Sequence, residues 1–300
     1  MSQPALDNFQ LKSLKLKGFF GSNQLSWEFG DIVNILGGPN GSGKSTVLRA
    51  IYHALKNDWA DFNNPFNFFD GVEIEMKNGL RFTLSKGGKK EPKWEGASLE
   101  VLKFFQDINI LYINSADFRI ARAVKYVHDS ALDKPLQLSM LDLNIEHELN
   151  QRNRNFMDAV LNASQQSQGE GIDSVIESFE TTFQVLQDFL EGYALEDRSN
   201  LVFRKGKDLI PYINLSTGEK QIVYLCLAIS NTYGKPTIAL LDEADLGMHI
   251  DWKRKLLREL LKLKPDMQII AATHSPSLIE GWYDYVKEMS GLINPAPQKA

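Results

Sequence analysis

The first third of the chain alternates between hydrophobic and polar residues, as β-strands do when one face is buried. Leu11 to Phe19 reads LKSLKLKGF, and Gln24 to Phe29 (QLSWEF) has the composition of a strand that pairs with it. Ile32 to Leu36 is a short apolar run of the kind that forms a buried strand. After a glycine-rich turn the period changes, and apolar residues spaced by three and four positions predict a helix from Lys44 to about Lys56.

A hairpin and one more strand follow in this β-rich region. Val72 to Met76 and Leu80 to Leu84 are apolar-rich, and Asn78-Gly79 between them supplies the residue types of a tight turn. Lys86 to Pro92 (KGGKKEP) reads as a basic, exposed loop, and Ile108 to Ile113 reads as another apolar strand.

The middle of the chain is polar, rich in Gln, Asn and Glu, and helical in pattern. Gln165 to Gly171 (QQSQGEG) divides it into two predicted helices, near Leu141–Ala163 and Ile172–Leu190. We therefore expect three parts: residues 1–129 as an N-terminal lobe, 130–200 as a helical insertion, and 201–300 as a C-terminal lobe.

The last third alternates between strands and helices, which predicts an α/β fold. The expected elements are a hairpin near Leu201–Tyr212, a helix that ends at Asn231, a strand at Thr237–Leu241, a helix at Trp252–Leu263 and a strand at Gln268–Ala272.

Composition and charge exclude several classes of protein. The formal net charge is -5 and there is no long basic tract, so DNA binding is left only to a local basic face. The single cysteine, Cys226, lies in an apolar stretch and excludes a disulfide framework or a cysteine metal site. The start MSQPALDNFQ lacks the features of a signal peptide, and no segment has the apolar length of a membrane span. We expect a cytoplasmic protein without a membrane partner.

A phosphate-binding loop follows the apolar run that ends at Leu36. Residues 38–45 (GPNGSGKS) match the pattern G-x-x-x-x-G-K-[ST], in which backbone amides curl around phosphates and the next helix points its positive end at them. Lys44 is predicted to reach the β- and γ-phosphates of ATP, and the Ser45 hydroxyl to hold Mg²⁺. The predicted ATP-binding residues here are Gly38, Pro39, Asn40, Gly41, Ser42, Gly43, Lys44, Ser45 and Thr46.

Two strands of the last third lead directly into polar residues. Thr237–Leu241 is followed by Asp242, a predicted ATP-site and Mg²⁺ ligand, and by Glu243, which can polarise an attacking water. The strand at Gln268–Ala272 leads to His274, which can contact the γ-phosphate. Alone, each pattern also fits an acidic turn or a structural histidine. Together with the phosphate loop they indicate a catalytic set of Lys44, Glu243 and His274.

The stretch INLSTGEKQIVYL allows two interpretations. Ser216 to Glu219 fits a capping box, in which the serine caps a helix and the glutamate reaches back to it. The same residues also fit half of a nucleotide site that is presented to a second copy of the protein. These residues are Ser216, Thr217, Gly218 and Glu219.

The phosphate loop, LSTGE, LLDE and ATHS, in this order, resemble the head of ATP-binding-cassette (ABC) ATPases, and GGPNGSGKST is typical of the RecF/SMC-like, non-transporter branch. DEADLGMH is also similar to a pattern of small AAA-type ATPases of bacterial anti-phage defence and DNA maintenance. The resemblance implies a P-loop NTPase fold: an N-terminal antiparallel β-subdomain, a mixed or parallel core sheet and a helical insertion. Thr217 and Glu219 depart from the usual glycine and glutamine of the signature.

The resemblance also implies how such heads work. Two heads sandwich two ATP molecules, so Ser216 and Gly218 of one copy would contact the ATP of another, in a dimer or a higher even-numbered oligomer. Asp245 to His249 would cross the interface beside the catalytic carboxylate. Where the family has a glutamine after the strand at Ile108–Ile113, this chain has Asn114, Ser115 and Asp117, and Phe19 and Phe20 are candidate adenine contacts.

Three functions fit these patterns. The first is an ATPase, with ATP and Mg²⁺, that controls a separate effector such as a nuclease or toxin. The second is an ATP-bound scaffold with slow turnover that holds such an effector. The third is the ATPase subunit of a membrane transporter, for which the polar insertion is unusual.

Overall fold

The computed structural model describes residues 8–21, 23–56, 68–86, 92–95, 107–115, 123–125, 136–165, 170–232 and 234–294. The chain forms two compact units. Unit 1 consists of residues 1–113, 234–244 and 266–300, and unit 2 of residues 114–233 and 245–265.

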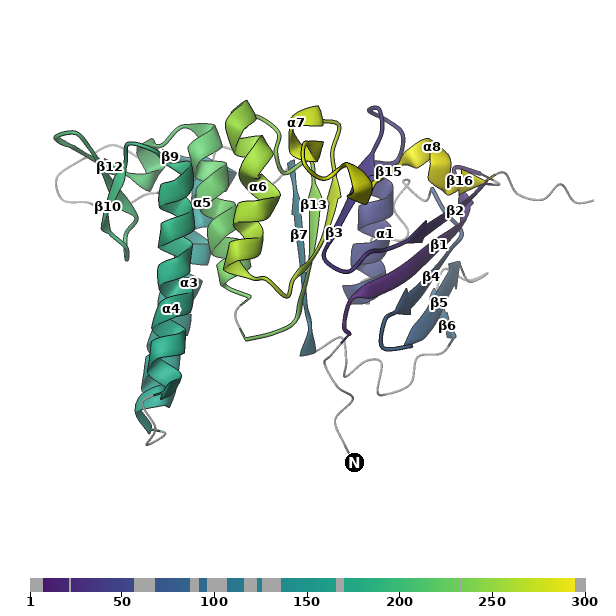
Figure 1. The fold of residues 1–300 in the computed structure, drawn as a ribbon, viewed down its shortest axis with the longest axis horizontal. Coiled ribbons are helices and arrows are strands. Elements are labelled where there is room, and N and C mark those ends of the chain that lie inside the picture. The colour runs from purple at the N-terminus through teal and green to yellow at the C-terminus, as the bar shows by residue number, and fades with distance from the viewer. Residues whose placement is uncertain are drawn as a thin grey trace, which may run out of the picture. The chain divides into compact units, whose positions relative to one another are not determined.

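Unit 1 begins with a six-stranded sheet in the order β16-β2-β1-β4-β5-β6 (Figure 1). Its paired strands are antiparallel. The strands are β1 (Leu11–Phe19), β2 (Asn23–Glu28), β4 (Gly71–Met76), β5 (Arg81–Lys86), β6 (Pro92–Glu95) and β16 (Ile293–Asn294). The predicted hairpin is confirmed, and Gly79 in its turn has a φ of 88°, which glycine adopts without strain.

A second sheet of unit 1 has the order β15-β3-β14-β13-β7. Its strands are β3 (Val33–Gly37), β7 (Asn109–Asn114), β13 (Thr237–Asp242), β14 (Gln268–Ala272) and β15 (Val286–Glu288). Strands β15, β3, β14 and β13 are parallel, and every residue of β3, β13 and β14 is buried. Continuous apolar strands of this kind need cover on both faces.

Helix α1 (Lys44–Lys56) lies between the two sheets, and its apolar stripe forms one core with both of them (Figure 1). Val47, Leu48 and Ile51 of the stripe are fully buried. Short elements α7 (Pro276–Ile279), η4 (Tyr283–Tyr285) and α8 (Met289–Leu292) complete unit 1. The antiparallel start, the parallel core and the helix after the phosphate loop are therefore all confirmed.

Gln268 joins the two sheets of unit 1 through a fully buried side chain. Its Oε1 accepts from the Leu11 amide at 2.8 Å, and its Nε2 donates to the carbonyls of Leu11 and Gly30, both at 3.0 Å. A buried amide is tolerated when its donors and acceptors are paired. This residue fixes the start of β1 against the start of β14.

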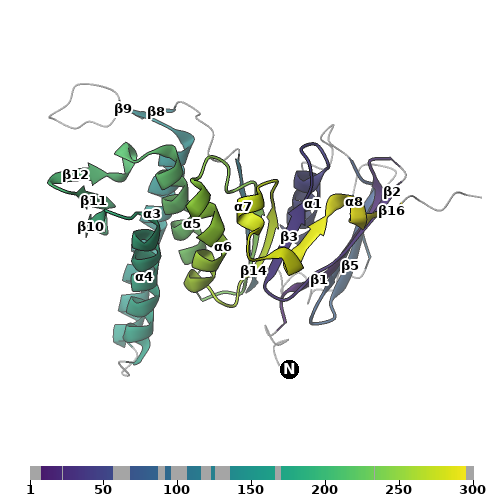
Figure 2. The ribbon, with the colours of Figure 1, turned by 45° about the horizontal axis from the view of Figure 1, so that its top comes forward.

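The described residues of unit 2 form four helices and two small sheets, and the helices are labelled in Figure 2. The helices are α3 (Met140–Gln165), α4 (Glu170–Phe189), α5 (Thr217–Ser230) and α6 (Ile250–Leu263), and α3 and α4 run side by side as the two predicted helices. The strands are β8 (Ala123–Lys125), β9 (Leu136–Leu138), β10 (Ala194–Asp197), β11 (Val202–Lys205) and β12 (Asp208–Pro211), and η3 (Tyr212–Asn214) precedes α5.

Strand β10 is an addition to the predicted elements. The predicted hairpin near Leu201–Tyr212 forms as β11 and β12, and β10 extends it to three strands from within the segment expected to be helical. The basic loop at Lys86–Pro92 lies largely outside the described residues.

Arg152 anchors α3 to α4 and α5. Its guanidinium donates to Thr182 Oγ1 at 3.1 Å, to Ser230 Oγ at 2.8 Å and to the Phe179 carbonyl at 2.7 Å. It also lies 4.4 Å from the ring centroids of Phe179 and Phe183. Burial lowers the pKa of Arg152 to about 10, so it stays charged at neutral pH.

None of the helices formed by the described residues combines the length and the apolar character needed to cross a bilayer.

Candidate nucleotide-binding site

The glycine-rich loop connects β3 to α1, as a phosphate-binding loop requires. Gly38, Gly41 and Gly43 have φ values of 143°, 77° and 99°. A Cβ atom on Gly43 would lie 2.6 Å from Phe20 Cε2, so any other residue would clash there. The loop therefore owes its shape to glycine at defined positions.

Lys44 folds back into its own loop. Only 4% of the residue is exposed, and its Nζ donates to the Gly38 carbonyl at 2.9 Å and the Pro39 carbonyl at 3.0 Å. The Ser42 hydroxyl is buried and has no hydrogen-bond partner among the described residues. Among the described residues this loop thus combines a buried cation bonded to carbonyls with an unpaired hydroxyl, and both fit a phosphate-bearing ligand.

Ser45 and Asp242 form a pair of adjacent oxygens beside this loop. The Ser45 hydroxyl donates to Asp242 Oδ1 at 2.8 Å, and the Tyr112 hydroxyl from β7 donates to Asp242 Oδ2 at 2.9 Å. A hydroxyl and a carboxylate are the hard oxygen ligands that Mg²⁺ takes together with phosphate oxygens. The donor set at this point therefore fits Mg²⁺.

Asp242 is almost fully buried, and this burial raises the pKa of its carboxyl above the usual value. The hydrogen bonds from Ser45 and Tyr112 and the positive charge of Arg49 oppose that rise, whereas the neighbouring Glu243 adds to it. Burial also raises the pKa of the Tyr112 hydroxyl, which therefore remains a hydrogen-bond donor at neutral pH.

Glu243 and His274 lie together at the carboxyl ends of two neighbouring strands. His274 Nδ1 is 3.3 Å from Glu243 Oε1. In the parallel register Asp242 pairs with Ala272, and Ala272 pairs with Leu36, so β13, β14 and β3 deliver their polar residues to one edge of the sheet. Glu243 has a φ of 53°, an uncommon conformation for a residue other than glycine. Its amide donates to the Ala272 carbonyl at 2.9 Å, which helps to hold this turn.

Ser216 and Glu219 form the predicted capping box at the start of α5 in unit 2. The Glu219 carboxylate accepts from the Ser216 amide at 2.7 Å, and the Ser216 hydroxyl accepts from the Glu219 amide at 3.4 Å. Thr217 is the first helical residue and is exposed, as is Ser216. The exposed serine at the positive end of a 14-residue helix is available to an anion.

The other predicted site residues separate into exposed and buried groups. Pro39 and Asn40 are exposed on the loop, and Thr46 is half-buried on the first turn of α1. Phe19 is fully buried in the core, whereas Phe20 is 42% exposed, which leaves Phe20 as the adenine candidate. Asn114 and Ser115 are half-buried, and Asp117 lies outside the described residues.

Tyr112 and Arg49 belong to this site although the motifs did not include them. The sequence signal was present for Tyr112, since it is the polar-tipped residue within an apolar strand that neighbours β13. Arg49 lies one turn of helix after Ser45, which puts both residues on the same side of α1.

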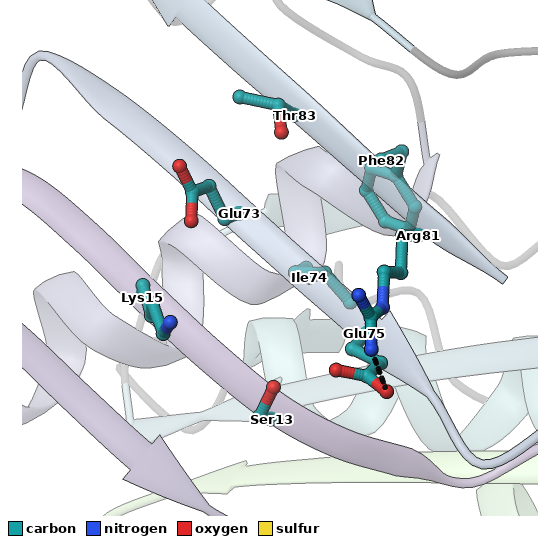
Figure 3. Close-up of a pocket in the computed structure, with 8 residues that line it drawn as sticks. All are labelled: Ser13, Lys15, Glu73, Ile74, Glu75, Arg81, Phe82 and Thr83. Atoms are coloured by element: carbon teal, nitrogen blue, oxygen red, sulfur yellow. Dashed lines mark hydrogen bonds and ion pairs between the residues drawn. The ribbon is translucent and has the colours of Figure 1, made fainter. Parts of the chain in front are cut away.

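A separate hollow of about 130 Å³ lies on the polar face of the antiparallel sheet (Figure 3). Glu75 there accepts from Lys12 at 2.8 Å and from Arg81 at 2.9 Å, and these bonds lower the pKa of its carboxyl. The hollow has no glycine-rich loop and no helix start, so its charges serve the cross-strand pairing of the sheet.

Comparisons with known proteins agree with this geometry. The model of the family described as "AAA domain, putative AbiEii toxin, Type IV TA system" matches residues 33–280. Septu protein PtuA of Bacillus thuringiensis is 22% identical over 308 residues, which cover 90% of this chain and 73% of PtuA. The retron Ec83 probable ATPase of Escherichia coli is 24% identical over 190 residues, which cover 58% of this chain and 35% of that protein.

The fold has a counterpart among solved structures. The SMC head bound to the C-winged helix domain of ScpA aligns with a TM-score of 0.59 and 15% identity, over 90% of this chain and 91% of the head. The chain belongs to the AAA domain family named above, it has the fold of SMC-type ATPase heads, and it is an ATPase.

Proposed function

We propose that two copies of this ATPase associate face to face around two ATP molecules, and that this association controls a separate effector protein. The observation that carries the proposal is the pair of half-sites on one chain. The phosphate loop with Lys44, Ser45 and Asp242 holds a nucleotide, and the exposed start of α5 offers a second anion-binding surface.

Each half-site has a distinct task in this proposal. Lys44 releases the carbonyls of Gly38 and Pro39 to bind phosphate oxygens, and Ser45 and Asp242 hold Mg²⁺. When bound, Mg²⁺ neutralises negative charge on the phosphates. Glu243 orients and polarises the attacking water, and His274 fixes the Glu243 carboxylate through the contact at 3.3 Å.

The start of α5 supplies the contact between copies. Its Ser216 hydroxyl and the amides of Thr217 and Gly218 face the terminal phosphate held by the other copy. The capping box supports this role because Glu219 orders the serine before any ligand arrives. Hydrolysis removes that phosphate, weakens the contact and lets the two copies separate.

The similarity to Septu PtuA and to a retron ATPase supports a role of this chain in phage defence or DNA maintenance. In this proposal the effector, such as a nuclease or toxin, is a separate polypeptide. The helical pair α3–α4 is the proposed contact for it, because Arg152 and Asp142 join that pair to α5, with the Asp142 carboxylate 2.6 Å from Lys220 Nζ.

Mixing two inactive variants tests the composite site. Lys44→Ala damages the phosphate loop, and Ser216→Arg places a bulky cation at the start of α5. Each variant alone should lack turnover, and Ser216→Arg should still bind ATP. Mixed together they should recover about a quarter of wild-type turnover, because half of the dimers are mixed and each of these has one intact site.

The control is a mixture of Lys44→Ala with Ser45→Ala, which damages the same half-site twice and should recover nothing. Turnover by Ser216→Arg alone at the wild-type rate would contradict the proposal. Glu243→Gln gives a second readout: it should accumulate as an ATP-bound dimer, measured as doubled mass by light scattering. A Glu243→Gln protein that stays monomeric in excess ATP would refute face-to-face association.

A further inference from the structure

Gln221 is a buried amide on α5 whose carbonyl oxygen has no hydrogen-bond partner among the described residues. Only 4% of the residue is exposed, and Oε1 is itself buried. Proteins rarely leave such a group unpaired, because it gives up its bonds to water and gains nothing in return. An apolar side chain of the same size would fill this position at lower cost, so the amide calls for a functional reason.

The amide faces the segment Asp245–His249, called here the 245–249 loop. A Cβ atom on Gly247 would lie 3.8 Å from Nε2 and 3.9 Å from Oε1 of Gln221. One turn earlier on α5, a Cβ atom on Gly218 would lie 3.5 Å from the Gly247 carbonyl oxygen. Helix α5 therefore touches the loop at two residues, Gly218 in the capped first turn and Gln221 in the second.

Within the described part of the chain, two backbone amides of the loop, those of Leu246 and Gly247, donate no hydrogen bond. Its internal turn uses the Met248 amide, which donates to the Asp245 carbonyl at 3.2 Å, and does not use the amides of Leu246 and Gly247. Its base is fixed, since Asp245 is buried and its carboxylate lies 3.2 Å from Lys253 Nζ. Gly247 has a φ of 82°, so the peptide groups around it can turn without the strain that a side chain would impose.

The same loop is continuous with the catalytic carboxylate. Ala244 alone stands between Asp245 and Glu243, whose own φ of 53° makes its orientation depend on how the chain is held on either side. We propose that Gln221 is a positioning residue for hydrolysis. Its carbonyl oxygen accepts a main-chain amide of Leu246 or Gly247 when α5 engages nucleotide, and this sets the 245–249 loop and Glu243. The inference rests on the proposed role of Glu243.

Gln221→Met tests the proposal because it keeps the length of the side chain and removes the acceptor. The thermal midpoint of the nucleotide-free protein should be equal to or above that of the wild type. The Kd and KM for ATP should stay within about twofold of the wild type, and kcat should fall about tenfold or more, because small errors in positioning cost that much. Leu225→Met, a buried residue on the same helix, is the matched control and should leave kcat unchanged.

Gly247→Ala tests independently whether Gln221 acts on Glu243 through the 245–249 loop. If Gln221 acts through the 245–249 loop, Gly247→Ala should lower kcat by itself, and adding Gln221→Met should lower it by less than about twofold more. Two outcomes would overturn the inference: a wild-type kcat in Gln221→Met, or a lower thermal midpoint with normal kcat per folded molecule. If Glu243→Gln hydrolyses ATP at the normal rate, the proposed catalytic role of Glu243 is wrong, and the role of Gln221 with it. If Glu243→Gln is inactive but Gln221→Met hydrolyses ATP at the normal rate, only the proposed role of Gln221 is wrong.

Discussion

The Ser45 hydroxyl donates a hydrogen bond of 2.8 Å to Asp242, although 197 residues separate the two in the chain. This bond ties the first turn of α1 to the end of β13. It also places a hydroxyl and a carboxylate together at the mouth of the phosphate loop, where a divalent cation would need them.

Ser45→Ala and Asp242→Asn should each lower ATP turnover by about 100-fold or more, because each removes a group that stabilises charge at the phosphates. ATP binding measured by calorimetry in EDTA should change little, whereas the gain in affinity on adding Mg²⁺ should disappear. Ser26→Ala on β2 is the matched control. An undiminished Mg²⁺ effect in both variants would remove these residues from the metal site.

Tyr112→Phe should destabilise the nucleotide-free protein, because a hydrogen bond to a carboxylate contributes about 1.5–3 kcal/mol. The loss should appear in urea unfolding as a lower midpoint with an unchanged slope. Tyr283→Phe removes a hydroxyl from a ring that is 71% exposed and should have no measurable effect. Equal midpoints for the two variants would show that the Tyr112 bond has no energetic role.

His274→Ala should lower kcat by about 10- to 100-fold while ATP binding is retained, because Glu243 loses the ring that holds it. Single-turnover assays would separate this loss from slow product release. His147→Ala changes an exposed histidine on α3 and provides the control. A normal single-turnover rate in His274→Ala would limit the histidine to a structural role.

Arg152→Ala should cost about 3 kcal/mol of unfolding free energy, because it removes three buried hydrogen bonds of the guanidinium and a side chain packed on two rings. Arg152→Lys should recover little of this, since an ammonium group cannot reproduce the guanidinium fork. Arg154→Ala, an exposed neighbour on α3, should lie within about 0.5 kcal/mol of the wild type. A wild-type midpoint for Arg152→Ala would contradict the anchoring role.

Cys226 should be unreactive in the native protein, because burial raises the pKa of its thiol above the ordinary 9.0. A thiol reagent at pH 8 should modify it only after unfolding. The sign of the pH effect follows from the same shift: above pH 9 the unfolded chain loses a proton that the folded chain keeps, so stability falls as pH rises. The wild type should lose about 1.4 kcal/mol per pH unit there relative to Cys226→Ala.

The structure brings the motif residues of the candidate nucleotide site together as the sequence predicts, because the required geometry is local. Glycine spacing shapes the loop that holds Lys44, and an apolar strand followed by Asp242 and Glu243 needs only the parallel sheet to bring it to the same edge. The capping box at Ser216 is likewise set within four residues. Motifs of this kind determine their own local backbone geometry, so the sequence alone is enough to predict them.

The residues that sequence reasoning missed act through contacts between distant segments. Tyr112 reaches Asp242 from a neighbouring strand, and Gln268 joins β14 to β1, which lie 257 residues apart. Arg152 reads as a surface arginine in a polar helix, yet it is buried against α4 and α5. The periodicity of hydrophobic residues indicates which side of a strand or helix is buried. It does not indicate which polar residue on that element has a buried hydrogen-bond partner elsewhere in the chain.

The anchoring of α3 has a consequence for how this architecture can diverge. Asp142, Glu148 and Arg152, all in the first half of the helix, link it to α5 and to the Asn231 cap of α5. Beyond Arg152, the described side chains of α3 include three exposed apolar residues, Phe156, Met157 and Leu161. Evolution can therefore lengthen, shorten or change the surface of the outer part of this helical pair, and with it the proposed effector contact, without altering the residues that anchor α3 to α5.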